Sequence, residues 1–246
     1  AVLPRRPLPQ AQALETQRQQ ALQDATPLHY PDYGAGPAAG GGGQRSTTVA
    51  AAARSSACPP QKGALLQRLV AFQAPQHALE LGTHLGYGSA YLALGLPTGG
   101  TLHTWEGAAP LAARAQQLWT TLGLAGRIHS RVGAFEALLQ AHALPPLELL
   151  YLDGHHTEAA TLHYYELLRP HLLPRALVIV DDIRWSPGMW RAWQALASRP
   201  EVTVSADCGQ LGLLWLQRPQ AKQHFYLWPN KKPRKGRGIM RLGQRP

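Results

Sequence analysis

The chain has 246 residues, and 45% of them are hydrophobic, which excludes a wholly disordered chain and allows a full core. Its formal net charge of +10 at pH 7 is typical of nucleic-acid-binding proteins, but the excess lies at the two ends. Arg5, Arg6 and seven basic residues from Lys231 to Arg245 are nine of the 24 Lys and Arg residues, which leaves 15 against 14 acidic residues. The body of the chain is therefore close to neutral, and we expect no specific nucleic-acid site there.

The number of cysteines and the length of the apolar runs indicate the cellular compartment of the protein. Two cysteines, Cys58 and Cys208, are too few for a disulfide framework and indicate free thiols in a reducing compartment. No apolar run approaches the ~18 residues that a membrane helix needs, and the first residues show no clear signal peptide. We therefore expect a cytoplasmic protein. A removed leader stays an open alternative, because the sequence does not begin with Met.

The first third of the chain predicts short helices joined by a long loop. Residues 1–9 are proline-rich, and Gln10–Gln23 has the pattern of a weak amphipathic helix. Three prolines and six glycines in Pro27–Gly43 predict a loop. The alanine-rich segment Thr47–Ser56 predicts another short helix, which Pro59-Pro60 ends.

Beyond this region, short apolar segments alternate with amphipathic ones. Strands are predicted at His77–Leu81, Thr101–Glu106, Ile128–Val132, Leu147–Asp153 and Ala176–Asp181. Helices are predicted at Lys62–Phe72, Ser89–Leu96, Pro110–Leu122, Phe135–His142, Glu158–Leu168 and Pro187–Ala197. This alternation predicts an α/β fold whose sheet is mostly parallel and doubly wound, with helices on both faces. Val202–Ala206 and Leu211–Gln217, separated by a four-residue turn, predict an antiparallel terminal hairpin.

A glycine-rich turn follows the first of these strands. Free N–H groups at the start of the next helix would point at a bound ligand, as in nucleotide sites. The glycines Gly82, Gly86 and Gly88 have the spacing G-x-x-x-G-x-G, and His84 stands where the dinucleotide fingerprint has its second glycine. This spacing favours a wider loop around an amino-acid-like group.

Ligands of open α/β sheets bind beyond the carboxyl ends of the strands, which makes the residues there candidates. Glu106 ends the strand after the glycine turn, where a carboxylate can accept both hydroxyls of a ribose; an exposed end-of-strand acid is the alternative. The candidate cofactor-binding residues are Glu80, Gly82, Thr83, Gly86, Tyr87, Gly88, Ser89, Glu106, Gly107, Gly133, Ala134, Phe135 and Asp153.

Three carboxylates lie at adjacent strand ends. Asp153, Asp181 and Asp182 would repel one another unless they were protonated or bound to a cation, and oxygen ligands favour Mg²⁺ or Ca²⁺. Alternatively, an acid such as Asp182 caps the following helix. Asp153 is also a candidate catalytic residue, together with His155 and His156, which follow it. The two histidines are candidate bases, since histidine titrates near neutral pH; they can equally be loop residues.

Tryptophans follow the last predicted parallel strand. Trp185, Trp190 and Trp193 are candidates for lining an acceptor pocket. The i, i+3 spacing of Trp190 and Trp193 favours a packed helix face instead.

These motifs together resemble one family. Glu80–Ala93, Trp105–Gly107, Leu152–His156 and Val178–Trp185 resemble the class I S-adenosylmethionine-dependent methyltransferases, in particular the bacterial small-molecule O-methyltransferase-like branch. The resemblance covers about residues 62–227 and extends more weakly to residues 32–36, in a Bacteroidetes-type subgroup. It implies S-adenosyl-L-methionine as cofactor and a Rossmann-like seven-stranded sheet with an antiparallel last strand.

The resemblance also implies roles for single residues. Gly82, Thr83 and Tyr87 would surround the methionine part of the cofactor, and Glu106 would hold the ribose. Ala134 and Phe135 would flank the adenine, although the family often has an acid where Ala134 stands.

The three aspartates match the metal ligands of metal-dependent members of this family. Asp153 would be the acid of the fourth strand, and Asp181-Asp182 the pair that ends the fifth, with Mg²⁺ as the candidate metal. These enzymes often carry a lysine base after the first acid, and here His155 and His156 stand in its place.

The leading hypothesis is transfer of a methyl group from S-adenosylmethionine to a hydroxyl of a small molecule. A nicotinamide-dependent oxidoreductase is the first alternative, which the glycine spacing and the terminal hairpin disfavour. An RNA-binding protein or RNA methyltransferase is the second, with weak, salt-sensitive binding by the basic tail. Dimers are common among such relatives, so a homodimer stays open.

The chain divides into three expected parts. Residues 1–61 would form an extension that helps to cover the site, and residues 62–228 the methyltransferase domain. Residues 229–246 would form a disordered basic tail.

Overall fold

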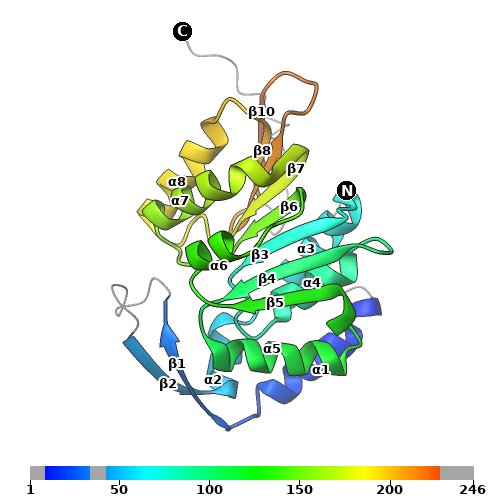
Figure 1. Ribbon diagram of the computed structural model, residues 1–246, viewed down its shortest axis with the longest axis vertical. Helices are drawn as coiled ribbons and strands as arrows, with labels where there is room; N and C mark the ends of the chain where they lie inside the picture. The colour runs from blue at the N-terminus through cyan, green and yellow to red at the C-terminus, as the bar shows by residue number, and fades with distance from the viewer. Residues whose placement is uncertain (1–8, 34–42, 228–246) are drawn as a thin grey trace, which may run out of the picture.

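An eight-stranded sheet forms the centre of the computed structural model, which describes residues 9–33 and 43–227 (Figure 1). The strand order is β10-β8-β9-β7-β6-β3-β4-β5. The strands are β3 (His77–Leu81), β4 (Thr101–Glu106), β5 (Ile128–Val132), β6 (Leu147–Leu152), β7 (Leu172–Val180), β8 (Val202–Asp207), β9 (Gly212–Leu216) and β10 (Gln223–Tyr226). Strands β3 to β7 are parallel, and β9 runs antiparallel to both β7 and β8. The predicted α/β fold with a terminal antiparallel hairpin is confirmed.

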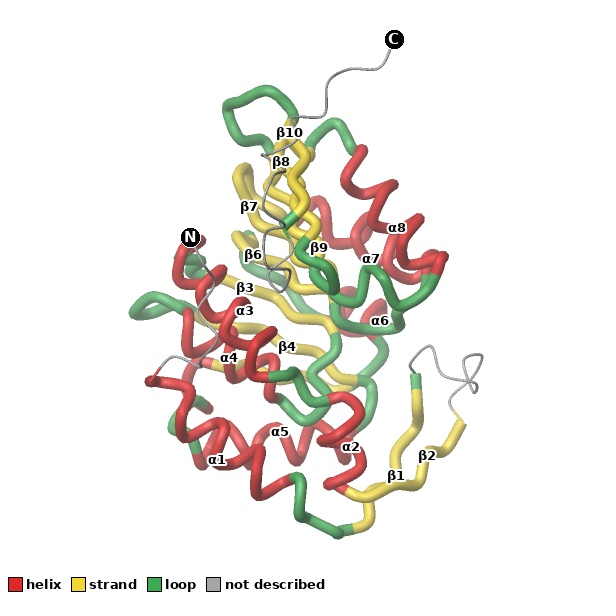
Figure 2. Tube along the Cα trace, turned by 180° about the vertical axis from the view of Figure 1, so that it is seen from behind, coloured by secondary structure: helices red, strands yellow, loops and turns green. Residues whose placement is uncertain are grey.

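Helices cover both faces of this sheet. They are α1 (Gln12–Ala21), α2 (Val49–Ser56), α3 (Pro60–Gln73), α4 (Tyr87–Gly95), α5 (Ala109–Thr121), α6 (Phe135–Ala141), α7 (Glu158–Leu168) and α8 (Pro187–Ser198). The apolar sides of α1, α3, α4 and α5 share one buried cluster, and those of α6, α7 and α8 share another across the sheet (Figures 1 and 2). The predicted helices and strands from α3 to β9 occur within a few residues of their expected bounds, the largest shift being the start of β7.

Three strands, β1, β2 and β10, were not predicted from the sequence. β10 adds an eighth strand parallel to β8, and its four residues are all exposed, so they carry no apolar alternation that could have revealed it. The predicted loop at Pro27–Gly43 is wrong for its first part, because β1 (Pro27–Asp32) pairs antiparallel with β2 (Gly43–Thr48). Leu28 and Tyr30 are buried on one side of β1, which accounts for the strand despite its prolines, since edge strands tolerate proline.

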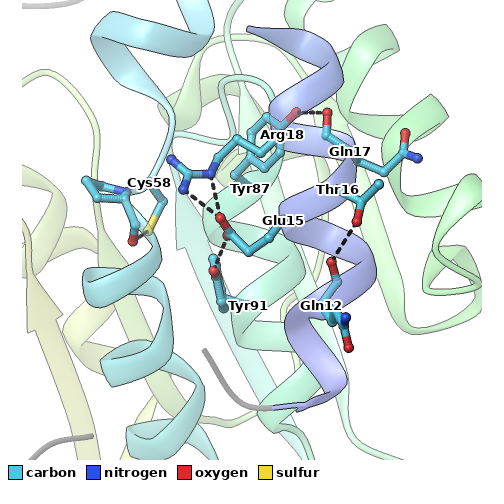
Figure 3. A network of polar contacts seen from close by, with 9 residues as sticks. Gln12, Glu15, Thr16, Gln17, Arg18, Cys58, Tyr87 and Tyr91 are labelled. Atoms are coloured by element: carbon cyan, nitrogen blue, oxygen red, sulfur yellow. Dashed lines mark hydrogen bonds and ion pairs between the residues drawn. The ribbon is translucent and has the colours of Figure 1, made fainter. Parts of the chain in front are cut away.

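Helix α1 packs against α4 through apolar contacts and hydrogen bonds. Leu14 is fully buried in the same cluster as the inner face of α4. Figure 3 shows Glu15 between Arg18 and Tyr91: the Arg18 Nη2 lies 2.6 Å from Glu15 Oε2, and the Tyr91 hydroxyl donates to Glu15 Oε1. The Tyr87 hydroxyl donates to the carbonyl of Gln17 at 3.4 Å. The N-terminal segment therefore packs directly on the helix that follows the glycine turn.

Some sequence predictions concern residues outside the described part of the chain. The basic tail and the Arg5-Arg6 pair fall there, as do residues 34–36 of the weak resemblance. Across residues 9–33 and 43–227, no helix is both long enough and apolar enough to cross a lipid bilayer.

Candidate cofactor and acceptor site

The glycine turn brings the end of β3 against the end of β6. Gly82 has φ +100°, and a Cβ there would lie 2.3 Å from the carbonyl oxygen of Asp153. Only glycine allows so close an approach of two backbones together with this backbone conformation. The turn ends at Gly86, which caps α4, so the N–H groups of the first turn of α4 that have no partner within the helix follow the glycine turn directly.

Glu80 places an unpartnered carboxylate oxygen beside this turn. The side chain is fully buried, and its Oε2 accepts hydrogen bonds from Ser89 and, at 2.6 Å, from Thr104. Its Oε1 has no hydrogen-bond partner, and a Cβ on Gly88 would lie 3.0 Å from it. Burial raises the pKa of Glu80 to about 7, although the bonds from Ser89 and Thr104 oppose this. A buried acceptor of this kind calls for a donor, and an ammonium group would supply one.

A small pocket that is open to solvent lies over this turn. It is lined by Ala57, Cys58, Glu80, Gly82, Thr83, His84, Leu85, Tyr87, Gly88 and Asp153. Sequence reasoning did not identify Ala57 and Cys58, which link α2 to α3. They lie far along the chain from the glycine turn, and no motif marks them.

Glu106 lies at the end of β4, on the other side of the turn. Its Oε2 accepts the backbone N–H of His84 at 2.7 Å, and its Oε1 accepts that of Ala108 at 2.9 Å. Burial raises the pKa of Glu106, and the backbone hydrogen bonds oppose this rise. A Cβ on Gly107 would lie 2.6 Å from the ring of Tyr33, so the end of the β1–β2 hairpin reaches this strand end.

An aromatic group lies where β5 and β6 end. Gly133 donates its N–H to the Glu106 carbonyl at 2.9 Å, which joins the ends of β4 and β5. Phe135 begins α6, and its ring lies 5.3 Å from that of Tyr164 and 6.5 Å from that of His155. The hydroxyl of Tyr164 lies 3.0 Å from His155 Nδ1. Tyr164 was missed by sequence reasoning because it lies in the middle of α7, away from any strand end.

A lysine from α3 enters the predicted carboxylate cluster. The ammonium of Lys62 lies 2.5 Å from Asp181 Oδ2, which also accepts the Tyr151 hydroxyl at 2.6 Å. The other oxygen of Asp181 accepts the backbone N–H of Asp182 at 2.8 Å. Sequence reasoning did not identify Lys62, because 119 positions separate it from Asp181 and only the packing of α3 joins them.

The pKa values of the three aspartates are shifted in different directions. Burial favours a raised pKa for Asp181, but the Lys62 charge and the hydrogen bonds outweigh it and lower that pKa. Burial and the neighbouring Asp181 charge raise the pKa of Asp153, and the same two causes raise that of Asp182. One carboxylate is thus held as an anion beside two whose ionisation is disfavoured.

The two predicted histidine bases lie in different surroundings. His156 Nε2 lies 3.7 Å from Asp153 Oδ1, whereas His155 belongs to the aromatic group with Phe135 and Tyr164. His155 and His156 have φ of 64° and 30°, and Asp182 has φ of 50°, which is costly for residues other than glycine. Backbone strain of this kind is frequent at functional sites.

The tryptophans separate into packed and exposed residues. Trp193 is 1% exposed, so the packed helix face predicted for it is confirmed. The ring of Trp190 lies under the guanidinium of Arg184, 4.5 Å from its centroid. Trp185 is 67% exposed in the loop that follows Asp182.

The described carboxylates do not fit a divalent metal as they are arranged. Throughout residues 9–33 and 43–227, no group of three or more His, Cys, Asp or Glu side chains is placed to hold a metal ion. Both oxygens of Asp181 already accept hydrogen bonds, and an ammonium lies against one of them. The arrangement therefore does not support the predicted magnesium site.

Comparisons with known proteins agree with this geometry. Residues 79–183 match a family model described as a methyltransferase domain. The human "Transmembrane O-methyltransferase" is 34% identical over 141 residues, covering 55% of this chain and 48% of that protein. A "Catechol O-methyltransferase" of Niastella koreensis is 28% identical over 127 residues, covering 50% of this chain and 57% of the relative. The chain thus spans about half the length of these curated relatives.

Solved structures share the fold. The O-methyltransferase from Bacillus cereus in complex with SAH has a TM-score of 0.59 and 25% identity, covering 68% of this chain and 86% of that one. The Bacteroidetes-type subgroup stays a prediction. Residues 79–183 therefore match a methyltransferase domain, and the chain is similar in sequence and fold to S-adenosylmethionine-dependent O-methyltransferases.

Proposed function

We propose that this chain binds S-adenosylmethionine in the pocket at the ends of β3 and β4 and methylates a hydroxyl group of a small molecule. The observation that carries the proposal is the unpartnered Oε1 of buried Glu80, which faces the glycine turn. The ammonium of the methionine part would donate to it, because a buried unpaired acceptor is costly. The solved Bacillus cereus relative, which was bound to SAH, supports the same cofactor class.

The other cofactor contacts follow from the same edge of the sheet. Thr83 is held by a 2.6 Å hydrogen bond to Thr104, so the turn keeps its shape around the methionine part. Glu106 would accept the ribose hydroxyls with the remaining lone pairs of its carboxylate oxygens, which also accept the backbone N–H groups of His84 and Ala108. Phe135 would stack against the adenine, and the backbone at Ala134 would contact the base edge.

For methyl transfer, the protein mainly has to align the methyl donor with the acceptor and to remove the proton of the acceptor hydroxyl. S-adenosylmethionine held there would supply an electrophilic methyl group, with its sulfur as the leaving group. His156 accepts the proton of the acceptor hydroxyl, and Asp153, 3.7 Å away, orients its ring. His155, held by Tyr164, is the less suitable base.

The acceptor would enter between two exposed aromatic residues. Tyr33, at the end of β1, is 48% exposed and reaches Gly107, while Trp185 is 67% exposed beyond β7. Both rings offer flat apolar surfaces near the strand ends. Phenols and catechols are therefore the first acceptors to test, and the name of the Niastella koreensis relative points the same way.

The proposal includes location and partners. The reading of residues 1–61 as a cover for the site, of residues 62–228 as the catalytic domain and of residues 229–246 as a basic tail remains part of it. Cys58 and Cys208 are both free and buried, which supports a cytoplasmic location. A homodimer and weak nucleic-acid binding by the tail also stay proposals.

A methyl-transfer screen over phenols, catechols and sugars tests the function. We expect saturable calorimetric binding of S-adenosylmethionine and a methylated phenolic product. His156→Gln should lower kcat by roughly 10²–10⁴-fold, the usual contribution of a general base, and Asp153→Asn should also lower it. His171→Gln, in the turn after α7, is the matched control. Binding of a nicotinamide dinucleotide without any binding of S-adenosylmethionine would overturn the proposal.

A further inference from the structure

Lys62 is held in place by helix packing. It lies in the first turn of α3, and a Cβ on the next residue, Gly63, would lie 2.1 Å from the ring of Tyr91. This contact between α3 and α4 is possible only because residue 63 is glycine. The Lys62 side chain is 16% exposed, and its partner Asp181 is fully buried. The ammonium therefore has a defined position inside the protein.

Both carboxylate oxygens of Asp181, the partner of this ammonium, already accept hydrogen bonds. Oδ2 accepts from Lys62 and from Tyr151, and Oδ1 accepts from the backbone of Asp182. A magnesium ion needs carboxylate oxygens at about 2.0–2.1 Å in octahedral geometry, so it would have to displace these donors. It would also lie close to the positive charge of Lys62, which repels it.

We propose that Lys62 is the built-in cation of the Asp153–Asp181–Asp182 cluster and takes the place that a divalent metal would have. Lys62 is a positioning residue: it neutralises Asp181 and so lets Asp153 stay next to it and orient His156. No proton leaves Lys62 in this scheme, and the acceptor proton goes to His156. The inference rests on the proposed methyl transfer, which it extends to a metal-independent form.

Magnesium binding is the direct test, and it does not depend on catalysis. Calorimetric titration of the full chain with MgCl₂ alone should show no saturable binding at millimolar concentrations. In Lys62→Met the carboxylates lose their cation, and saturable magnesium binding should appear. Lys62→Arg keeps the charge and should bind no magnesium. Lys222→Met removes an exposed lysine that donates to the Arg199 carbonyl, and it controls for a general change in charge.

Turnover gives the second readout. EDTA should leave the rate of the parent chain unchanged. Lys62→Met should lose roughly 10²-fold in kcat, the effect of about 1 Å of misplacement, with little change in KM for S-adenosylmethionine, and MgCl₂ should restore part of it. Lys62→Arg should retain most of the activity and also shows whether the site tolerates substitution.

The outcomes separate the inference from the proposed function. Saturable magnesium binding by the parent chain, with turnover lost in EDTA, would overturn the inference and leave methyl transfer intact. Lys62→Met that folds but gains no magnesium affinity would also overturn it. If no acceptor is methylated although S-adenosylmethionine binds, the proposed function fails, and the magnesium titrations still decide the role of Lys62.

Discussion

At the scale of single residues, Glu80 is the side chain whose hydrogen-bonding most directly indicates a cofactor contact. Ser89 and Thr104 donate to one of its oxygens, and the other, buried beside Gly88, has no partner, while the residue lines the pocket. Its pKa of about 7, raised by burial, places its ionisation inside the range of ordinary assays. A ligand ammonium would favour the ionised form, so binding and ionisation are coupled.

Glu80 therefore predicts a pH dependence of cofactor affinity. Between about pH 6 and about pH 7 the affinity for S-adenosylmethionine should rise, because the carboxylate becomes charged while an α-amino group of pKa near 7.7 remains mostly charged. Glu80→Gln should bind more weakly and lose this rise, as measured by calorimetry across that range. Glu166→Gln, which alters a surface ion pair with Arg199, serves as the control. An unchanged pH profile in Glu80→Gln would assign the ionisation to another group.

At the scale of elements, two helices connect the N-terminal part of the chain to the site. α1 packs on α4 through Leu14 and through Glu15, which joins Arg18 to Tyr91 (Figure 3). α3 brings Lys62 to the ends of β6 and β7. Part of the site is thus supplied by elements that precede the glycine turn in sequence.

Truncation of Leu14 tests whether α1 is part of the cooperative fold. Leu14→Ala should lower the free energy of unfolding by about 2–5 kcal/mol, because it leaves a cavity at a fully buried position. Urea denaturation of the full chain measures this change. Gln19→Ala, at an exposed position of the same helix, should stay within about 0.5 kcal/mol of the parent. A loss equally small for Leu14→Ala would mean that α1 detaches before the core unfolds.

At the scale of the whole molecule, two partly buried histidines, His84 and His103, make the stability of the fold depend on pH. Burial lowers the pKa of His84 to about 4, with Arg45 adding to the effect. Burial also lowers the pKa of His103 to about 4, and the neighbouring His129, whose ring centroid lies 5.3 Å away, acts in the same direction. Both rings are therefore neutral in the folded protein at neutral pH.

The sign of the resulting pH effect follows from proton counting. Between the unfolded value of 6.5 and the folded value of about 4, the unfolded chain binds more protons at these histidines. Their contribution to stability is fully present above about pH 6.5 and is lost as the pH falls toward 4. Urea midpoints should fall over this window, and His103→Gln should reduce the slope. A slope that is the same in this variant would show that His103 is not responsible.

The sequence by itself determined the alternation of strands and helices and the place of the glycine turn. These are local properties: apolar periodicity predicts each element from β3 to β9, and the residues at strand ends, such as Glu80 and Glu106, follow from topology alone. β1 and β2 escaped prediction because the prolines and glycines of Pro27–Gly43 favour a loop, and β10 escaped it because its four exposed residues carry no apolar alternation.

Only the tertiary structure decided which charge faces the aspartates. In the sequence, a balancing cation is needed by three neighbouring carboxylates, those of Asp153, Asp181 and Asp182. A bound metal ion was therefore the prediction. Folding brings Lys62 across 119 positions to within 2.5 Å of Asp181, and it separates His156, near Asp153, from His155, in the aromatic group. Pairing between distant elements depends on how helices pack on the sheet, and no periodicity along the chain encodes it.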